Sequence, residues 1–248
     1  MWSDCSARFR WPCPALWLGS LLWVAPLGAQ EPAPAPSGYA QPALRPEEAE
    51  ALQAFDLLKR QHDAALLHYH ALLPSRKSEA KRREIFDRYY PKPEDWGPRF
   101  AEVNQRFPGT EGAAKGLVWV VNHVDSVELE SRARRTLLQD HLSRPILAEI
   151  CETLAQPDKR EGLTDLEFLF EHSPSDWVKG NAVKGLCTAD LAALRKSDTP
   201  ILRERLEQHI GILRDRYGSQ VMEGQPGSAW ATRLARELRH LSLGQQFL

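Results

Sequence analysis

The sequence lacks an excess of charge of either sign, since 32 Lys and Arg residues face 33 Asp and Glu residues. Without a field of one sign a chain does not attract polyanions, so we expect no nucleic-acid partner. It also lacks a glycine-rich phosphate loop, a Gly-x-Ser-x-Gly elbow, a His-Glu-x-x-His helix and a Cys-x-x-Cys pair. These absences exclude the enzyme classes that the motifs mark. We therefore expect a protein that is not an enzyme and that uses no cofactor or metal.

Long apolar runs are scarce as well, and the most prominent one lies near the N-terminus. Arg8 and Arg10 precede an apolar run from Ala15 to Ala25, and Ala29 offers a small residue before Gln30. The run is too short to span about 30 Å of hydrocarbon comfortably as a helix. The layout predicts a signal peptide over residues 1–29 and export to a periplasmic or extracellular location, without membrane attachment after cleavage. A retained membrane anchor is the alternative.

Residues 30–45 contain the Pro/Ala-rich stretch "QEPAPAPSGYAQ", a composition that cannot form a packed core. We predict a linker here. The remainder, residues 46–248, carries helical periodicity and start and stop signals almost throughout, and we assign it to one helical domain.

The helical domain shows one amphipathic or apolar segment after another, separated by short breaks at proline and glycine. The run Leu117 to Val121 is apolar all round and indicates the most buried helix, with a strand as the alternative. No other stretch predicts a strand. Short loops between helices favour antiparallel neighbours, so the predicted fold class is all-α, an α-solenoid or irregular bundle of stacked antiparallel helical hairpins. The predicted helices cover 46–73, 77–90, 93–107, 111–124, 127–142, 145–155, 163–171, 176–194, 200–217 and the segment that ends at Gly244.

Only two cysteines, Cys151 and Cys187, remain if cleavage follows Ala29. The stretches "ILAEICETLA" and "AVKGLCTADL" can be aligned at an offset of 36 residues that superimposes these cysteines, a spacing typical of stacked helical repeats. In an oxidising compartment a disulfide between them would add about 3 to 4 kcal/mol of stability. Because both lie in apolar helical stretches, a pair of buried free thiols is the alternative.

Two groups of side chains are candidates for chemical sites. The segment "HDAALLHYH" holds His62, Asp63, His68 and His70, but histidine spacings of six and two spread the rings around a helix, so a solvated surface is favoured over a metal site. An enzymatic site would need carboxylates such as Glu149 and Glu152 beside His172, whereas acidic residues on helices are usually solvated.

The tryptophans of the helical domain are scattered along it rather than clustered. Core packing accounts for this distribution, and a binding groove lined by indoles is the alternative. The residues are Trp96, Trp119, Trp177 and Trp230.

Several stretches in succession resemble the helical N-terminal region that precedes the redoxin domain of secreted bacterial thiol-disulfide oxidoreductase-like proteins. They include "YYPKPEDWGPRFAEVNQRFPGTEGAAKGLVWVV", "FLFEHSPSDWVKGNAVKGLC" and "LARELRHLSLGQ", and the similarity extends from Leu44 to Gln245. The resemblance implies a thioredoxin-like redoxin domain after Gly244, and that domain is missing from this sequence. No catalytic residue can therefore be carried over.

Two functions follow. The first is a secreted, non-enzymatic helical scaffold that binds another protein through its helical surface. The second is an accessory or truncated part of a thiol-disulfide oxidoreductase system, working with a separate redoxin subunit.

Overall fold

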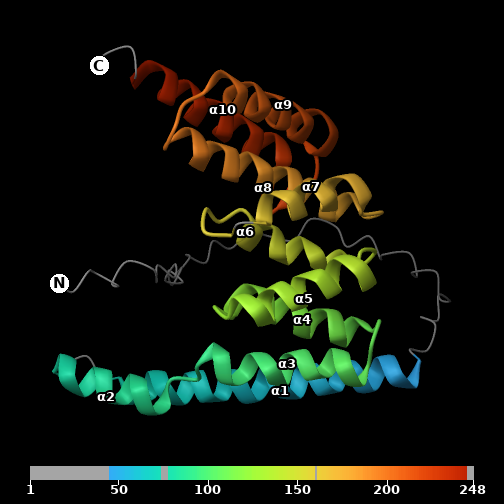
Figure 1. The fold of residues 1–248 in the computed structure, drawn as a ribbon, viewed down its shortest axis with the longest axis vertical. Coiled ribbons are helices and arrows are strands. Elements are labelled where there is room, and N and C mark those ends of the chain that lie inside the picture. Colours follow the sequence, from blue (N-terminus) through green and yellow to red (C-terminus); the bar gives the residue numbers. More distant parts are fainter. Residues whose placement is uncertain (1–44, 74–77, 160, 245–248) are drawn as a thin grey trace, which may run out of the picture. The chain divides into compact units, whose positions relative to one another are not determined.

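The structure is a computed structural model that describes residues 45–73, 78–159 and 161–244, and these residues form an all-α fold, as predicted (Figure 1). The predicted signal peptide, and all of the predicted linker except Arg45, lie outside the described residues. The elements in chain order are α1 (Pro46–Leu72), α2 (Glu79–Tyr89), α3 (Pro93–Arg106), α4 (Glu111–His123), α5 (Val127–Asp140), η1 (Pro145–Ile150), α6 (Cys151–Leu154), α7 (Gly162–His172), α8 (Asp176–Leu194), α9 (Pro200–Tyr217), β1 (Val221–Met222), β2 (Gln225–Pro226) and α10 (Gly227–Gly244).

Helix starts follow from hydroxyl side chains that accept a hydrogen bond from the backbone N–H three residues on, which satisfies one of the free donors of the first turn. Thr110 caps α4 in this way, with a distance of 3.2 Å from the Ala113 nitrogen to its Oγ1. The same arrangement begins α2, α5, α8 and α9, at Ser78, Ser126, Ser175 and Thr199.

Two predictions about local structure were wrong. The segment predicted as one helix over 145–155 is a 3-10 helix, η1, followed by the single turn of α6. Its aligned counterpart lies within the long α8, so the two cysteine-containing stretches are not equivalent repeat units. A hairpin of β1 and β2 was also missed; its two-residue turn places Glu223 (φ 50°) and Gly224 (φ 75°) in the left-handed region, as hairpin turns of this length require.

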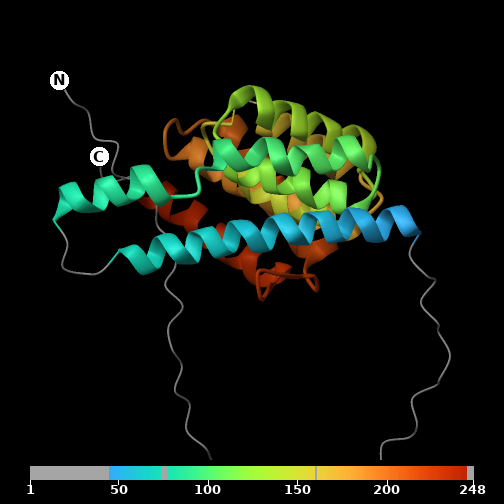
Figure 2. The same cartoon turned by 90° about the horizontal axis from the view of Figure 1, so that it is seen from below.

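Consecutive helices pack against one another from α3 to α5 and again from α7 to α10, while α1 lies against α2, α3 and α4 (Figures 1 and 2). At the contact of α1 with α4, a Cβ on Gly112 would lie 2.4 Å from the Ala51 carbonyl oxygen, so only glycine fits. Buried Glu48 of α1 accepts a 2.6 Å hydrogen bond from the Glu111 N–H, which fixes a carboxylate at the positive end of α4.

Buried apolar side chains form two clusters. The first draws on α3 to α8 and includes Phe100, Leu147 and Cys151. The second draws on α8, α9, the hairpin and α10 and includes Cys187 and Met222. Helix α8 contributes to both clusters, because twelve of its residues are buried. The predicted burial of 117–121 in α4 is confirmed, and the strand alternative is not found there.

Ionic contacts join neighbouring helices inside this fold. The Asp190 carboxylate of α8 is fully buried, accepts a 2.9 Å hydrogen bond from Arg205 Nε and lies 3.0 Å from His209 Nδ1, both on α9. Burial of a charge is costly unless it is paired and hydrogen-bonded, and this arrangement meets both conditions. None of the helices in the described part of the chain combines the length and the apolar character needed to cross a membrane.

Candidate binding groove

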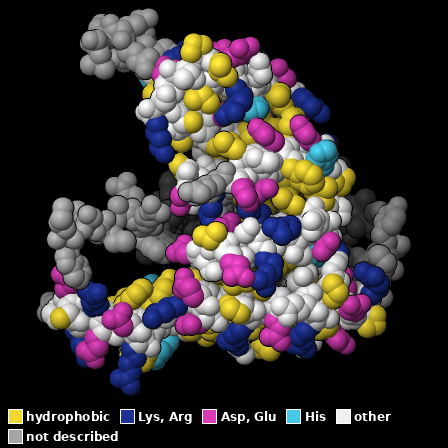
Figure 3. Space-filling model, viewed as in Figure 1, with side chains coloured by type: hydrophobic (Ala, Val, Ile, Leu, Met, Phe, Trp, Pro, Cys, Tyr) yellow, Lys and Arg dark blue, Asp and Glu magenta, His cyan; other side chains and the backbone are white. Residues whose placement is uncertain are grey.

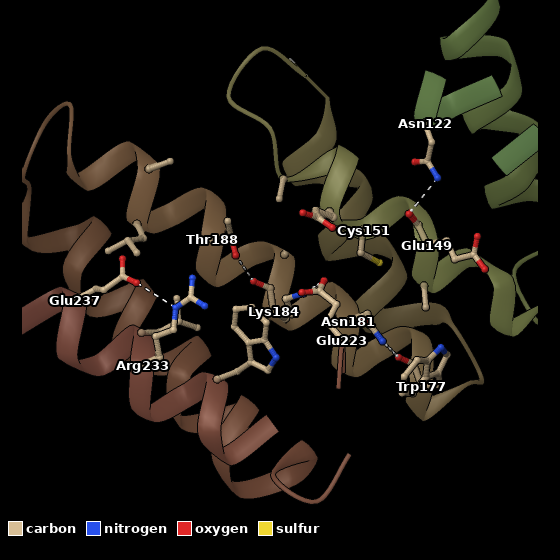
Figure 4. A pocket seen from close by; sticks show the side chains of 18 of the residues that line it. Asn122, Glu149, Cys151, Trp177, Asn181, Lys184, Thr188, Glu223, Arg233 and Glu237 are labelled. Atoms are coloured by element: carbon tan, nitrogen blue, oxygen red, sulfur yellow. Dashed lines mark hydrogen bonds and ion pairs between the residues drawn. The ribbon is translucent and has the colours of Figure 1, made fainter. Parts of the chain in front are cut away.

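A groove of about 740 Å³ lies between η1, α6 and α4 on one side and α8, the hairpin and α10 on the other (Figure 4). Its volume falls within the usual range of ligand pockets, about 300 to 1,000 Å³. Both polar and apolar side chains line it. We call the part around Trp230 the Trp230 end and the part around Trp177 the Trp177 end. The lining residues used below are Asn122, Glu149, Cys151, Glu152, Trp177, Asn181, Lys184, Thr188, Arg195, Glu223, Trp230, Arg233 and Glu237.

Asn122 holds the η1 and α6 wall to α4. Its Nδ2 donates to the Glu149 carbonyl oxygen at 3.2 Å, and its Oδ1 accepts from Thr153 Oγ1 at 2.6 Å. Both the donor and the acceptor of the Asn122 amide therefore bind residues of the η1 and α6 wall. The consequence is a fixed backbone at Glu149, whose side chain lines the groove.

At the Trp230 end every cation is paired. Lys184, with only 8% of its surface exposed, lies 4.3 Å from the centre of the Trp230 ring and forms an ion pair with Glu223. Arg233 lies 4.8 Å from the same ring and 3.4 Å from Glu237. Indole faces attract cations at these distances.

Further contacts fix this end in place. Trp230 Nε1 donates to the Met222 carbonyl oxygen at 3.0 Å, and Arg195 pairs with Glu237 at 2.6 Å. Glu223 is itself a turn residue of the hairpin, with its backbone in the left-handed region. This position brings its carboxylate to Lys184. The Trp230 end therefore satisfies its own charges.

The Trp177 end is built on the first turn of α8. The Trp177 carbonyl oxygen accepts 2.9 Å hydrogen bonds from both Asn181 Nδ2 and Gln220 Nε2. Gly180 allows Gln220 to approach, because a Cβ there would lie 2.5 Å from its Oε1. The backbone is thus fixed, while 41% of the surface of Trp177 stays exposed.

Two carboxylates of the groove have no partner. Glu149 and Glu152 line it, and among the described residues no side chain or backbone group forms a hydrogen bond or ion pair with either carboxylate. Both are exposed residues by surface area. Desolvation by the neighbouring walls nevertheless raises the pKa of Glu149, and the positive charge of Lys115 acts in the opposite direction. The carboxylates remain acceptors available to a ligand.

The two cysteines are free thiols in the structure, each in a different core cluster. Desolvation by burial raises the pKa of Cys151 to about 12, although Lys184 acts to lower it. Burial and the Asp190 charge raise the pKa of Cys187 as well. Since the thiolate is the reactive form, neither cysteine is an activated nucleophile.

The structure brings together only part of the side chains that the sequence marks as candidates for chemistry. Glu149 and Glu152 share the groove, whereas His172 lies outside its lining at the end of α7, next to Phe168. Among the described residues, no group of three or more His, Cys, Asp and Glu side chains is placed to hold a metal ion.

The prediction that the α1 histidines are solvated was wrong for one of them. The His62 ring lies edge-on against two indoles, with its centre 5.3 Å from that of Trp96 and 5.2 Å from that of Trp119. The His62 side chain is 12% exposed. His68 and His70 are exposed, as predicted. Core packing, the predicted role of the indoles, is confirmed for Trp119 and Trp96 in the first cluster and for Trp230 against the second, while Trp177 and Trp230 also line the groove.

Sequence reasoning missed Asn181, Lys184 and Glu223. A signal was present for Lys184, because it interrupts an otherwise small and apolar stretch of helix from Ala182 to Cys187. A Lys in such a stretch requires a counter-charge. No comparable signal points to Glu223, which reaches Lys184 only through the fold of the hairpin.

Charge over the surface is mixed in sign. On the face drawn in Figure 3, Lys and Arg side chains alternate with Asp and Glu side chains rather than gathering in one patch. The groove is therefore distinguished by which charges are paired, and not by a strong field of one sign.

No family model, curated protein or solved structure matches the chain, so the fold and the groove stand on the chain's own sequence and geometry.

Proposed function

We propose that this protein is a non-enzymatic helical scaffold that binds another protein by taking a segment of it into the groove. The supporting observation is the groove itself: indoles at both ends, and carboxylates and an amide oxygen without partners between rigid helices. Stacked helices offer this kind of extended concave surface to polypeptides. The partner is a protein rather than a nucleic acid, because the free groups of the groove are acceptors and anions.

Two threonines provide a matched test. Thr188 on α8 lines the groove, and Thr232 on α10 does not; both are exposed, and each Oγ1 donates to the carbonyl oxygen four residues earlier, at 3.0 and 2.8 Å. Thr188→Arg should fill the groove with little effect on folding, whereas Thr232→Arg leaves the groove open. The measurement is affinity purification from source-cell extract with wild type and both variants, followed by mass spectrometry.

We expect that proteins identified by mass spectrometry with both wild type and Thr232→Arg are not recovered with Thr188→Arg. Recovery of the same proteins with all three baits would place the interaction elsewhere and contradict the proposal. Recovery of no protein with any bait would contradict it as well.

The part in thiol-disulfide chemistry that the sequence resemblance implies stays a prediction, as does export. The buried thiols of Cys151 and Cys187 do not favour redox activity. Titration with a thiol reagent at neutral pH should show almost no fast-reacting thiol in the folded mature chain and two in the unfolded chain. Fast reaction of either thiol in the folded chain would favour the redox function.

A further inference from the structure

The two ends of the groove contain the same kinds of group but differ in one respect. At the Trp230 end the indole and the carboxylates of Glu223 and Glu237 are occupied by cations of the chain itself. The rest of the groove is lined by the Trp177 indole and by the carboxylates of Glu149 and Glu152, and no described Lys or Arg lies on that ring or forms an ion pair with those carboxylates. Lys115 pairs with Glu111 and acts on Glu149 only through its charge at longer range, so the component that no direct contact supplies is a cation.

Asn181 supplies a third acceptor at the Trp177 end. Asn181 is 9% exposed, and its Nδ2 must be the atom facing the Trp177 carbonyl, because only a donor can bind there. Its Oδ1 therefore lies on the other side of the amide, and no donor among the described residues reaches it. This oxygen is not one of the buried side-chain atoms without a partner, so it is open to water, and a ligand N–H group would take the place of that water.

We propose that the Trp177 end binds an extended polypeptide segment of the partner through a Lys or Arg side chain. The cation lies against the Trp177 indole and pairs with Glu149 or Glu152, and a backbone N–H of the segment donates to Asn181 Oδ1. This inference rests on the proposed function of the groove, and it specifies the chemistry of the segment that the groove accepts.

Several features favour an extended basic segment over other ligands. An extended chain has backbone N–H groups without internal partners, which is the donor that Asn181 lacks. A free polyamine would satisfy the carboxylates and the indole, yet it has no peptide N–H group. An acidic or phosphorylated segment would place like charges beside Glu149 and Glu152 in a partly desolvated groove.

Selection from a peptide library tests the proposal even while the partner is unidentified. Random 12-residue peptides displayed on phage are selected on the immobilised mature chain, and peptides displaced by soluble Thr188→Arg protein are discarded. We expect the enriched peptides to share a Lys or Arg at one position. Enrichment of peptides with no basic position overturns this inference while the proposed function stands; enrichment of no peptide contradicts the proposed function itself.

Variants then locate the cation. For one enriched peptide, labelled with fluorescein, the double variant Glu149→Gln/Glu152→Gln should raise Kd about tenfold, the size of effect that follows from losing a single charge-assisted contact. The matched control is Glu167→Gln on α7, an exposed carboxylate outside the groove, and its Kd should stay within about twofold of wild type.

Trp177→Ala should also weaken binding about fivefold, consistent with a cation–π contact at a partly exposed ring. Replacing the basic residue of the peptide by norleucine should abolish the difference between wild type and the double Glu variant. Equal affinity of all variants for the basic peptide overturns the inference. Displacement of the peptide by spermidine at equal concentration also overturns it, because the site would then recognise amines rather than a polypeptide.

Discussion

The Trp230 and Trp177 ends of the groove use the same chemistry for different purposes. Around Trp230 the cations Lys184 and Arg233 lie on the indole and pair with Glu223 and Glu237, so the contacts tie α8 to the hairpin and α10. Around Trp177 the indole is exposed, and the Glu149 and Glu152 carboxylates of the same groove have no hydrogen-bond or ion-pair partner in the described part of the chain. The contacts of the first end stabilise the fold, whereas the second end is the one that we propose binds a ligand.

The largest expected difference between the two ends concerns stability. Trp230→Ala removes the hydrogen bond to Met222 and both cation–π contacts, and should lower the free energy of unfolding by about 3 kcal/mol. Trp177→Ala should lower it by less than about 1 kcal/mol, because its ring is already partly exposed. Urea unfolding followed by circular dichroism measures both. Equal losses would remove the distinction between the ends.

A smaller effect is expected at the hairpin turn. Glu223→Asn introduces a residue that tolerates positive φ, and it removes a methylene together with the charge that pairs with Lys184. Since Lys184 is buried but the Glu223 side chain is 48% exposed and well solvated, the loss should be about 1 to 2 kcal/mol. In the same unfolding assay Glu152→Gln is the control at the other end, expected within about 0.5 kcal/mol of wild type. A larger loss for Glu152→Gln than for Glu223→Asn would reverse the assignment of roles.

The smallest effect concerns His62, whose ring contacts the indoles of Trp96 and Trp119. Burial lowers the pKa of His62, although Asp63 acts to raise it. The unfolded chain therefore binds the proton more readily than the folded chain does, and stability is lost as pH falls from the unfolded pKa, about 6.5, towards the lower folded pKa. His62→Phe should reduce the fall in stability between pH 7 and pH 5 by less than about 1 kcal/mol.

Chemical unfolding at the two pH values measures this slope. His68→Gln, an exposed histidine of the same helix, is the control and should leave the slope unchanged. Burial lowers the pKa of His123 and His141 too, so part of the slope should persist in His62→Phe. A slope that is unaffected by His62→Phe would contradict the role assigned to the ring.

Local signals in the sequence predicted most of the fold. Capping residues such as Thr110 and Thr199, prolines at helix starts and the apolar run of α4 act within one or two turns, so the helices and the all-α class follow from them. The 3-10 helix and the hairpin were not predictable in this way. The turn Glu223–Gly224 carries a non-glycine residue at positive φ, which only its contacts in the folded chain hold there.

The groove was predictable in its parts and not in its assembly. The sequence singled out Glu149, Glu152 and the tryptophans, but whether a charge is paired depends on residues far away in the chain. Lys184 meets a carboxylate 39 positions on, and the Trp177 carbonyl meets Gln220, 43 positions on. Periodicity along one helix carries no information about such contacts, because they depend on how helices are placed against each other.

Site-specific photo-crosslinking tests the central claim, that the groove holds a polypeptide segment, most directly. Benzoylphenylalanine is introduced at Ala192, which lines the groove on α8, and in a control chain at Thr232 outside it. We expect protein adducts from Ala192 that are absent from Thr232, and we expect the crosslinked segments to contain a Lys or Arg when they are mapped by mass spectrometry. Adducts of equal yield from both positions, or none from Ala192, would contradict it.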